Sequence, residues 1–197
     1  DFWLRFMTSH PKDASRKLID VMAGSRHVAH QFHLPLQSGS DGILKAMNRH
    51  YDTERYLSTV DDLRERIPDV TITSDIIVGF PGESEEQFEQ LAQFADDIRF
   101  ERLGCFAYSQ EEDTPAADFP NQLDEEIKQN RADIIMEQQQ TVMAEYCESL
   151  IGKEIEVLCE GFDRIAECFF GRSYADAPEV DGCVFFTCGD RKPKAGE

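Results

Sequence analysis

The chain has 197 residues, of which 41% are hydrophobic, including 14 Phe, so it can bury a core and is not a disordered protein. Its formal net charge is −19, and between Glu83 and Asp133 there are 15 acidic residues against 4 basic ones. This charge repels nucleic acid and favours a basic partner, although a merely soluble acidic surface explains it as well. No apolar run is long enough to span a membrane and no signal segment precedes the first strand, which predicts a cytoplasmic protein.

The first part of the chain alternates predicted strands with predicted helices. Short apolar runs bounded by turn residues predict strands at residues 3–7, 32–36, 70–79 and 103–108. Apolar spacing and capping residues predict a short helix over residues 18–22 that ends at Gly24, and further helices at residues 43–47, 56–67 and 84–98. Each crossover is long enough for parallel pairing, so we expect an α/β fold, either a βα barrel or an open sheet. The informative loops then lie at the carboxyl ends of the strands.

A change of periodicity follows this region. A long helix is predicted for residues 124–150, with Ile127, Ile134, Gln138, Val142 and Tyr146 along one side. Short strands are predicted at residues 154–160, 164–171 and 182–188, which make a small antiparallel module beginning near residue 151. Three strands are fewer than a small barrel needs to close, so this module is expected to be truncated. The chain also starts in a predicted strand, as the middle of a protein would.

The cysteine and histidine patterns favour no metal site. The six Cys residues show no CxxC or CxxxCxxC spacing, and the chain is too large to be a disulfide scaffold, so reduced thiols are expected. His27, His30 and His33 follow one another at intervals of three. No acid or thiol nearby completes a set of four ligands, and we interpret them as structural or surface histidines.

The strongest local motif is the turn at residues 79–82, Gly-Phe-Pro-Gly, between a predicted strand and a predicted helix. Glycine at such a place lets the backbone approach a ligand closely. Glu83, Glu85 and Glu86 already occupy the positive end of the following helix dipole, so an apolar or aromatic ring is a better guest than phosphate. The alternative is an ordinary tight turn between a strand and a helix.

Other polar residues follow or interrupt the predicted strands. Residues 35–41 supply an amide and two hydroxyls, although a Ser40 or Asp41 helix cap explains them equally. Asp75 places a carboxylate in an otherwise apolar strand, either to bind a substrate or as a structural hydrogen-bond acceptor. Residues 111–113, Glu-Glu-Asp, suit a basic substrate or simply face solvent.

Three stretches in this order resemble the radical S-adenosylmethionine methylthiotransferases: HLPLQSGSDGILKAMNRHY, TSDIIVGFPGESEEQFEQ and YSQEEDTPAA. The later stretch IGKEIEVLCEG resembles the start of the TRAM domain of that family. The resemblance implies that residues 1–150 are the carboxyl-terminal part of a radical SAM βα barrel with a linking helix. Residues 151–197 would then be a partial TRAM domain, a small antiparallel module of OB-like type.

The resemblance also implies cofactors. Family members hold S-adenosylmethionine and two 4Fe-4S clusters. Gly79, Phe80 and Gly82 would lie near S-adenosylmethionine, and the polar groups that would face the same cavity are Gln37, Ser38, Ser40 and Asp75. The CxxxCxxC cluster motif is absent from residues 1–197 and is expected upstream, so the chain alone is expected to be inactive.

The resemblance covers two substrate types. FMTSHPKD and HLPLQSGS resemble the MiaB type, which modifies an adenosine beside the tRNA anticodon. RLGCFAYSQEEDTPAA and GRSYADAPEVDG resemble the RimO type, which methylthiolates an aspartate of small-subunit ribosomal protein twelve. The acidity favours the RimO type, with a basic ribosomal protein bound through the TRAM domain and the acidic surface. The alternatives are the tRNA type, a non-catalytic module that binds the ribosomal protein or RNA, and an unrelated βα-barrel enzyme that uses its acids for proton transfer.

Overall fold

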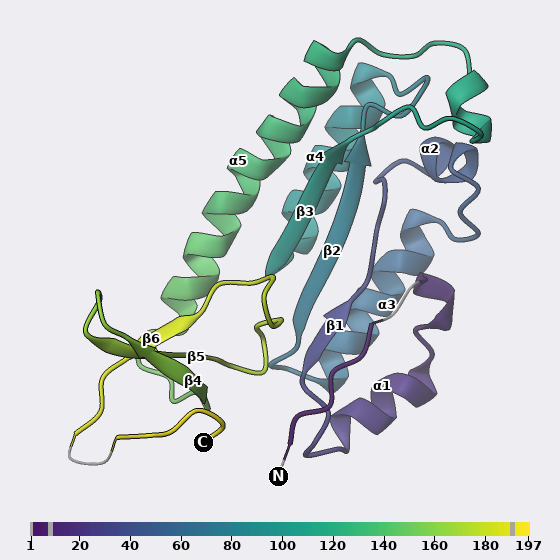
Figure 1. Ribbon diagram of the computed structural model, residues 1–197. Coiled ribbons are helices and arrows are strands. Elements are labelled where there is room, and N and C mark those ends of the chain that lie inside the picture. The colour runs from purple at the N-terminus through teal and green to yellow at the C-terminus, as the bar shows by residue number, and fades with distance from the viewer. Residues whose placement is uncertain (1, 8–9, 190–191) are drawn as a thin grey trace.

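A parallel sheet of three strands forms the centre of the computed structural model, which describes residues 2–7, 10–189 and 192–197 (Figure 1). The strands lie in the order β1 (Gln31–His33), β2 (Thr71–Val78) and β3 (Arg102–Ala107). Phe32 is paired with Ile72, and Ile76 is paired with Cys105. The predicted α/β class with parallel strands is confirmed.

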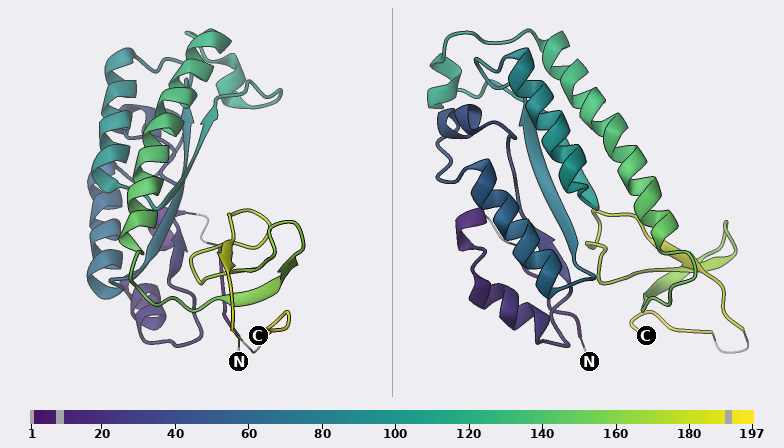
Figure 2. Two further views of the ribbon diagram at one scale, coloured as in Figure 1. Left: turned by 90° about the vertical axis from the view of Figure 1, so that its left-hand side faces the viewer. Right: turned by 180° about the vertical axis from the view of Figure 1, so that it is seen from behind.

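Helices cover one face of this sheet. The helices of the chain are α1 (Arg16–Ala23), α2 (Asp41–Ala46), α3 (Thr53–Arg66), α4 (Glu85–Ile98) and α5 (Glu125–Ser149), with short 3-10 turns η1 (Pro11–Asp13) and η2 (Pro115–Asp118). Of these, α2 lies at the carboxyl end of the sheet (Figure 1). Helices α3, α4 and α5 lie together on one side, and most of the opposite side of the sheet has no helix against it (Figure 2). The sheet therefore presents an open face, as one side of a partial barrel does.

The alternation of β2 determines which side chains reach each face. Ile72, Ile76 and Val78 are buried against the helices, while Thr73 and Asp75 on the other face are half-buried.

Helix α4 begins at the predicted capping box, in which the Ser84 and Gln87 side chains each accept a backbone N–H of the other residue.

The second module is a small antiparallel sheet, as predicted. Its strands are β4 (Leu158–Asp163), β5 (Cys168–Arg172) and β6 (Val184–Phe186), in the order β4-β5-β6. Phe169 lies between Phe162 and Phe186, with ring centroids 5.0 and 5.8 Å away. The first predicted strand began too early, because residues 154–157 pair with no neighbour in a sheet.

The expected strand at residues 3–7 is wrong. Leu4 alone pairs with Val28, in an isolated bridge beside β1, and Phe2 and Met7 on either side of it are exposed. Leu4 bonds to His27 and Ala29 through its N–H and carbonyl, and no sheet pairing continues through residues 5–7. The strand prediction overestimated this segment because aromatic and apolar residues are frequent in it.

The predicted side of α5 is correct at Val142, which is buried, but wrong at two of its isoleucines. Ile127 and Ile134 are exposed, whereas the buried residues are Lys128, Arg131, Ala132, Ile135, Gln139 and Val142. Three of these six are polar, so the hydrophobic pattern misplaced the buried face in the first half of the helix. Each of the three has a hydrogen-bond partner: Gln139 Nε2 donates to the Phe100 carbonyl at 3.0 Å, Arg131 donates to Glu83 and Glu85, and Lys128 donates to Glu125 of the same helix.

Among the described residues, no helix is long and apolar enough to cross a membrane.

Candidate active site

The turn after β2 is held in a conformation that favours glycine. Gly79 and Gly82 have φ angles of 72° and 85°, in the left-handed region where other residues are strained. The Gly79 N–H donates to Glu83 Oε1 at 3.0 Å, and the Gly82 N–H donates to the Asn121 carbonyl at 3.0 Å. The turn is therefore fixed from two sides, by the start of α4 and by the segment that precedes α5.

Phe80 is part of a small apolar cluster at this end of the sheet. Its ring packs edge-to-face on Tyr108 and Phe119, at centroid distances of 5.3 and 6.0 Å, and Ile43 of α2 joins the same cluster. Tyr108 follows β3, so the cluster joins the carboxyl ends of β2 and β3. The tip of the turn therefore presents an apolar surface, which suits an aromatic ring of a ligand better than a phosphate group.

The segment after β1 turns its hydroxyls into the protein. Gln37, at a φ of 70°, pairs with β2 through its backbone, and Ser38 and Ser40 are buried. Ser38 Oγ accepts the Ser40 N–H at 3.2 Å, and Ser40 Oγ accepts the Gln87 amide at 3.3 Å. Ser40 precedes α2 but makes no side-chain cap bond there, so its hydroxyl ties this loop to α4.

A row of polar side chains crosses the open face from β1 to β2. Thr73 Oγ1 accepts the Gln31 amide at 3.0 Å and lies 2.9 Å from His33 Nδ1. Either atom can be the donor between His33 Nδ1 and Thr73 Oγ1, because a hydroxyl both donates and accepts. His33 Nε2 lies 3.4 Å from Asp75 Oδ2. The row therefore orients the Asp75 carboxylate.

The Asp75 carboxylate lies next to Gly104 of the neighbouring strand β3. A Cβ on Gly104 would lie 2.9 Å from Asp75 Oδ1 and 3.1 Å from the Phe106 ring. The Asp75 side chain is 41% exposed and Phe106 is 57% exposed, so an acceptor and an aromatic ring stand side by side on the open face. Such a pair can bind a ligand that carries both hydroxyl or ammonium donors and a flat ring.

The predicted site residues thus fall into two groups. Gly79, Phe80 and Gly82 form the turn at the end of β2, and Asp75 lies on the open face about 13 Å back along the strand, at roughly 3.3 Å per residue. Sequence reasoning missed His33 and Phe106. The signal for His33 was its alternation with Gln31, which matches the alternation of Thr73 and Asp75 on the neighbouring strand.

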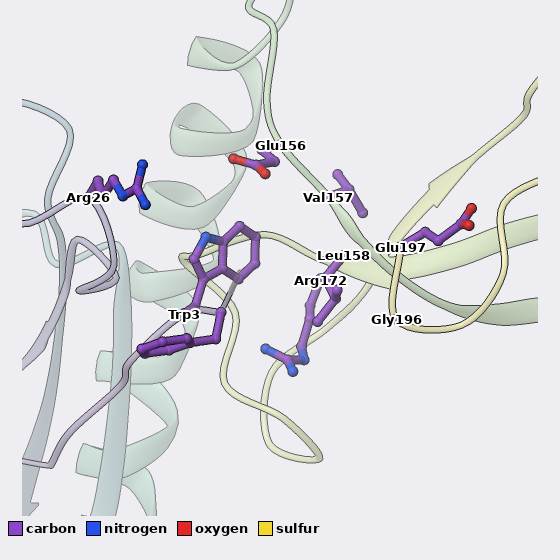
Figure 3. Close-up of a pocket in the computed structure, with 9 residues that line it drawn as sticks. Trp3, Arg26, Glu156, Val157, Leu158, Arg172, Gly196 and Glu197 are labelled. Atoms are coloured by element: carbon purple, nitrogen blue, oxygen red, sulfur yellow. The ribbon is translucent and has the colours of Figure 1, made fainter.

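A separate hollow of about 530 Å³ lies at the other end of the molecule, beside the antiparallel module (Figure 3). Trp3 and Arg26 line it from the amino-terminal part of the chain, and Glu156 and Arg172 line it from the antiparallel module. None of the predicted site residues lies there.

Comparison with known proteins decides the family. The Radical SAM superfamily profile matches residues 1–95, and the TRAM domain profile matches residues 151–197. A tRNA-2-methylthio-N(6)-dimethylallyladenosine synthase of Alkaliphilus oremlandii is 49% identical over 80% of this chain and 34% of that protein. A ribosomal protein uS12 methylthiotransferase RimO of Lachnoclostridium phytofermentans is 40% identical over 93% of this chain and 42% of that protein. The chain belongs to the radical SAM methylthiotransferase family.

The chain spans about two fifths or less of the length of these two relatives, at 42% and 34%. Among solved structures, the radical SAM enzyme coproporphyrinogen III oxidase of Escherichia coli is 17% identical with a TM-score of 0.48, covering 82% of this chain and 34% of that one.

The open face fits S-adenosylmethionine, the cofactor that this methylthiotransferase family uses. The Asp75 carboxylate can accept hydrogen bonds from ribose hydroxyls or from the amino group, and Phe106 offers a ring face for adenine. The buried hydroxyls of Ser38 and Ser40 already have partners within the protein. Their predicted role in cofactor binding stays a prediction, as do the predicted roles of Gln37, Asp75, Gly79, Phe80 and Gly82.

The described residues do not fit an iron-sulfur cluster. No group of three or more His, Cys, Asp or Glu among them is placed to hold a metal ion. Burial raises the pKa of the Cys105 thiol to about 12, which keeps it protonated and opposes its use as a thiolate ligand. Ligands for a cluster would have to come from outside the described residues.

Proposed function

We propose that this chain is part of a methylthiotransferase that modifies an aspartate of ribosomal protein uS12. The extent of the relatives' matches supports this choice. RimO relatives match 93–95% of the chain, and matches of that length must include most of residues 151–197. The tRNA-modifying relatives match 80–82% of it. The relatives named for a protein substrate therefore share more of this chain than the relatives named for a tRNA product.

Charge supports the same substrate. Glu111, Glu112 and Asp113 are exposed on the loop after β3, at the same end of the sheet as the turn at residues 79–82 (Figure 1). The region from Glu83 to Asp133 carries 15 acids against 4 bases. Such a surface attracts a basic protein and repels the phosphates of RNA, most strongly at low ionic strength.

The residues on the open face would bind and orient the cofactor. Asp75 accepts hydrogen bonds from S-adenosylmethionine, His33 holds the Asp75 carboxylate, and Phe106 covers the adenine. In this family, bound S-adenosylmethionine supplies the radical that removes hydrogen from carbon and the methyl group that is placed on sulfur. The apolar cluster around Phe80 keeps water from that end of the sheet.

The test uses the full-length gene product, reconstituted with iron and sulfide under anaerobic conditions. It is incubated with S-adenosylmethionine, a reductant and a sulfide source, together with either uS12 or a tRNA. Mass spectrometry should detect one added methylthio group on an aspartate of uS12 and none on the tRNA. Modification of the tRNA alone would assign the MiaB type, which the 49% identity favours.

The acidic surface is tested by charge reversal. Replacing both Glu111 and Glu112 with Lys should reduce capture of uS12 in a pull-down. The matched control is the same reversal at Glu54 and Glu65, which are exposed on α3 outside the acidic region. Equal capture by the two double variants would show that the loop does not recognise the substrate. Capture of uS12 by a protein that never modifies it would favour the non-catalytic binding module.

A further inference from the structure

One turn of α5 presses directly on the glycine turn after β2. A Cβ on Gly79 would lie 2.5 Å from Cγ of Lys128 and 3.0 Å from its Cβ. Real Cβ atoms essentially never approach this closely, so the missing side chain of Gly79 is what admits α5. The missing side chain of Gly79 is therefore needed for packing against Lys128, in addition to any role in binding a ligand.

Arg131, one helical turn further along α5, binds the residues that follow the turn. Arg131 Nη1 donates to Glu83 Oε1 at 2.6 Å, and Nη2 donates to Glu85 Oε2 at 2.9 Å. Glu83 Oε1 also accepts the Gly79 N–H. The Arg131 and Glu83 side chains are 6% and 1% exposed. A single buried oxygen thus joins the end of β2, the start of α4 and helix α5.

Lys128 completes the contact from the other side. Its side chain is buried, and Nζ lies 2.6 Å from Glu125 Oε1 and 5.4 Å from the centroid of the Tyr108 ring. Tyr108 in turn packs on Phe80, at the tip of the turn. Lys128 and Arg131 therefore contact the turn, the residues after it and the apolar cluster around Phe80.

Stability alone is a poor explanation for these contacts, because well-packed hydrophobic residues often replace a buried ion pair without loss. A charged pair with several directed hydrogen bonds does fix geometry, since its donors and acceptors accept only one arrangement. We propose that Lys128 and Arg131 are positioning residues, which hold the turn at residues 79–82 in the shape that S-adenosylmethionine needs. This rests on the cofactor assignment of the proposed function.

The test compares Arg131→Met with Arg99→Met in the reconstituted full-length gene product. Arg99 also forms an ion pair with α5, through Glu145, but it lies at the far end of α4 from the turn. Affinity for S-adenosylmethionine is measured by equilibrium dialysis well below the unfolding temperature of every variant. Arg131→Met should weaken binding about tenfold, the equivalent of one charge-assisted hydrogen bond, while Arg99→Met leaves it unchanged.

Two further measurements separate positioning from general stability. Native-state hydrogen exchange of the amides at residues 79–83 should speed up in Arg131→Met and not in Arg99→Met, and Arg131→Lys should restore part of the protection. Gly79→Ala should also lose cofactor affinity, because its Cβ would lie 2.5 Å from Cγ of Lys128 and its φ of 72° is strained for alanine.

Unchanged affinity and unchanged exchange in Arg131→Met would overturn the proposal. A wild-type protein with no affinity for S-adenosylmethionine would overturn both the proposal and the proposed function. Cofactor binding that depends on Arg131, in a protein that does not modify uS12, would refute the proposed function and support the positioning role.

Discussion

The buried face of α5 can be tested with two adjacent isoleucines. Ile135 is 1% exposed, whereas Ile134 is 42% exposed. Replacing Ile135 with Ala removes three buried carbon groups, at about 0.8 kcal/mol each, and leaves a cavity, for a total cost of about 3–4 kcal/mol. The same change at Ile134 removes groups that are half in water and leaves no closed cavity, so it should cost about 1 kcal/mol or less.

The two variants control for each other. Both replace Ile with Ala inside the same helix, so the small gain in helix propensity, about 0.4 kcal/mol, is shared and cancels. Urea unfolding of the 197-residue chain, followed by circular dichroism, should separate their free energies of unfolding by about 2–3 kcal/mol. An Ile134→Ala variant that is as unstable as Ile135→Ala would refute the helix orientation, and with it the contacts of Lys128 and Arg131.

The remaining predictions concern a buried thiol and a tight strand pair. With its pKa raised to about 12 by burial, Cys105 should react with a disulfide reagent much more slowly than the exposed Cys147, until the chain is unfolded. Between pH 9 and about 12 the unfolded chain releases a proton that folded Cys105 keeps, so the free energy of unfolding should fall as pH rises, and less so in Cys105→Ala. Gly171→Ala would place a Cβ 2.2 Å from the Leu158 carbonyl oxygen, so it should destabilise the antiparallel module by about 2 kcal/mol or more. Limited proteolysis would detect the last effect as faster cleavage between β4 and β5, and an unchanged rate would contradict it.

The amino-acid sequence by itself determined those helices and strands whose formation depends on residues close together in the chain. The apolar alternation at residues 70–79 predicted β2, and Ser84 with Gln87 predicted the start of α4, since a capping box closes within four residues. The order of strands and helices was sufficient to predict parallel pairing. Taken together over nearly the whole chain, the sequence motifs predicted the family to which the chain belongs.

Only the tertiary structure decided which side chains meet. Lys128 and Arg131 count as polar surface in any hydrophobic pattern, and they are buried because Glu83, Glu125 and the Gly79 backbone lie where their charges and stems can be accommodated. Their burial shifted the inner face of α5 away from the predicted one.

The tertiary structure also decides which polar side chains form the row on the open face. His33 faces Asp75 only through the register between β1 and β2, which brings together residues from distant parts of the chain. No local pattern contains that register, because it is set by the packing of three helices against one face of the sheet. The strands could therefore be predicted from the sequence, whereas the polar row that crosses them required the fold.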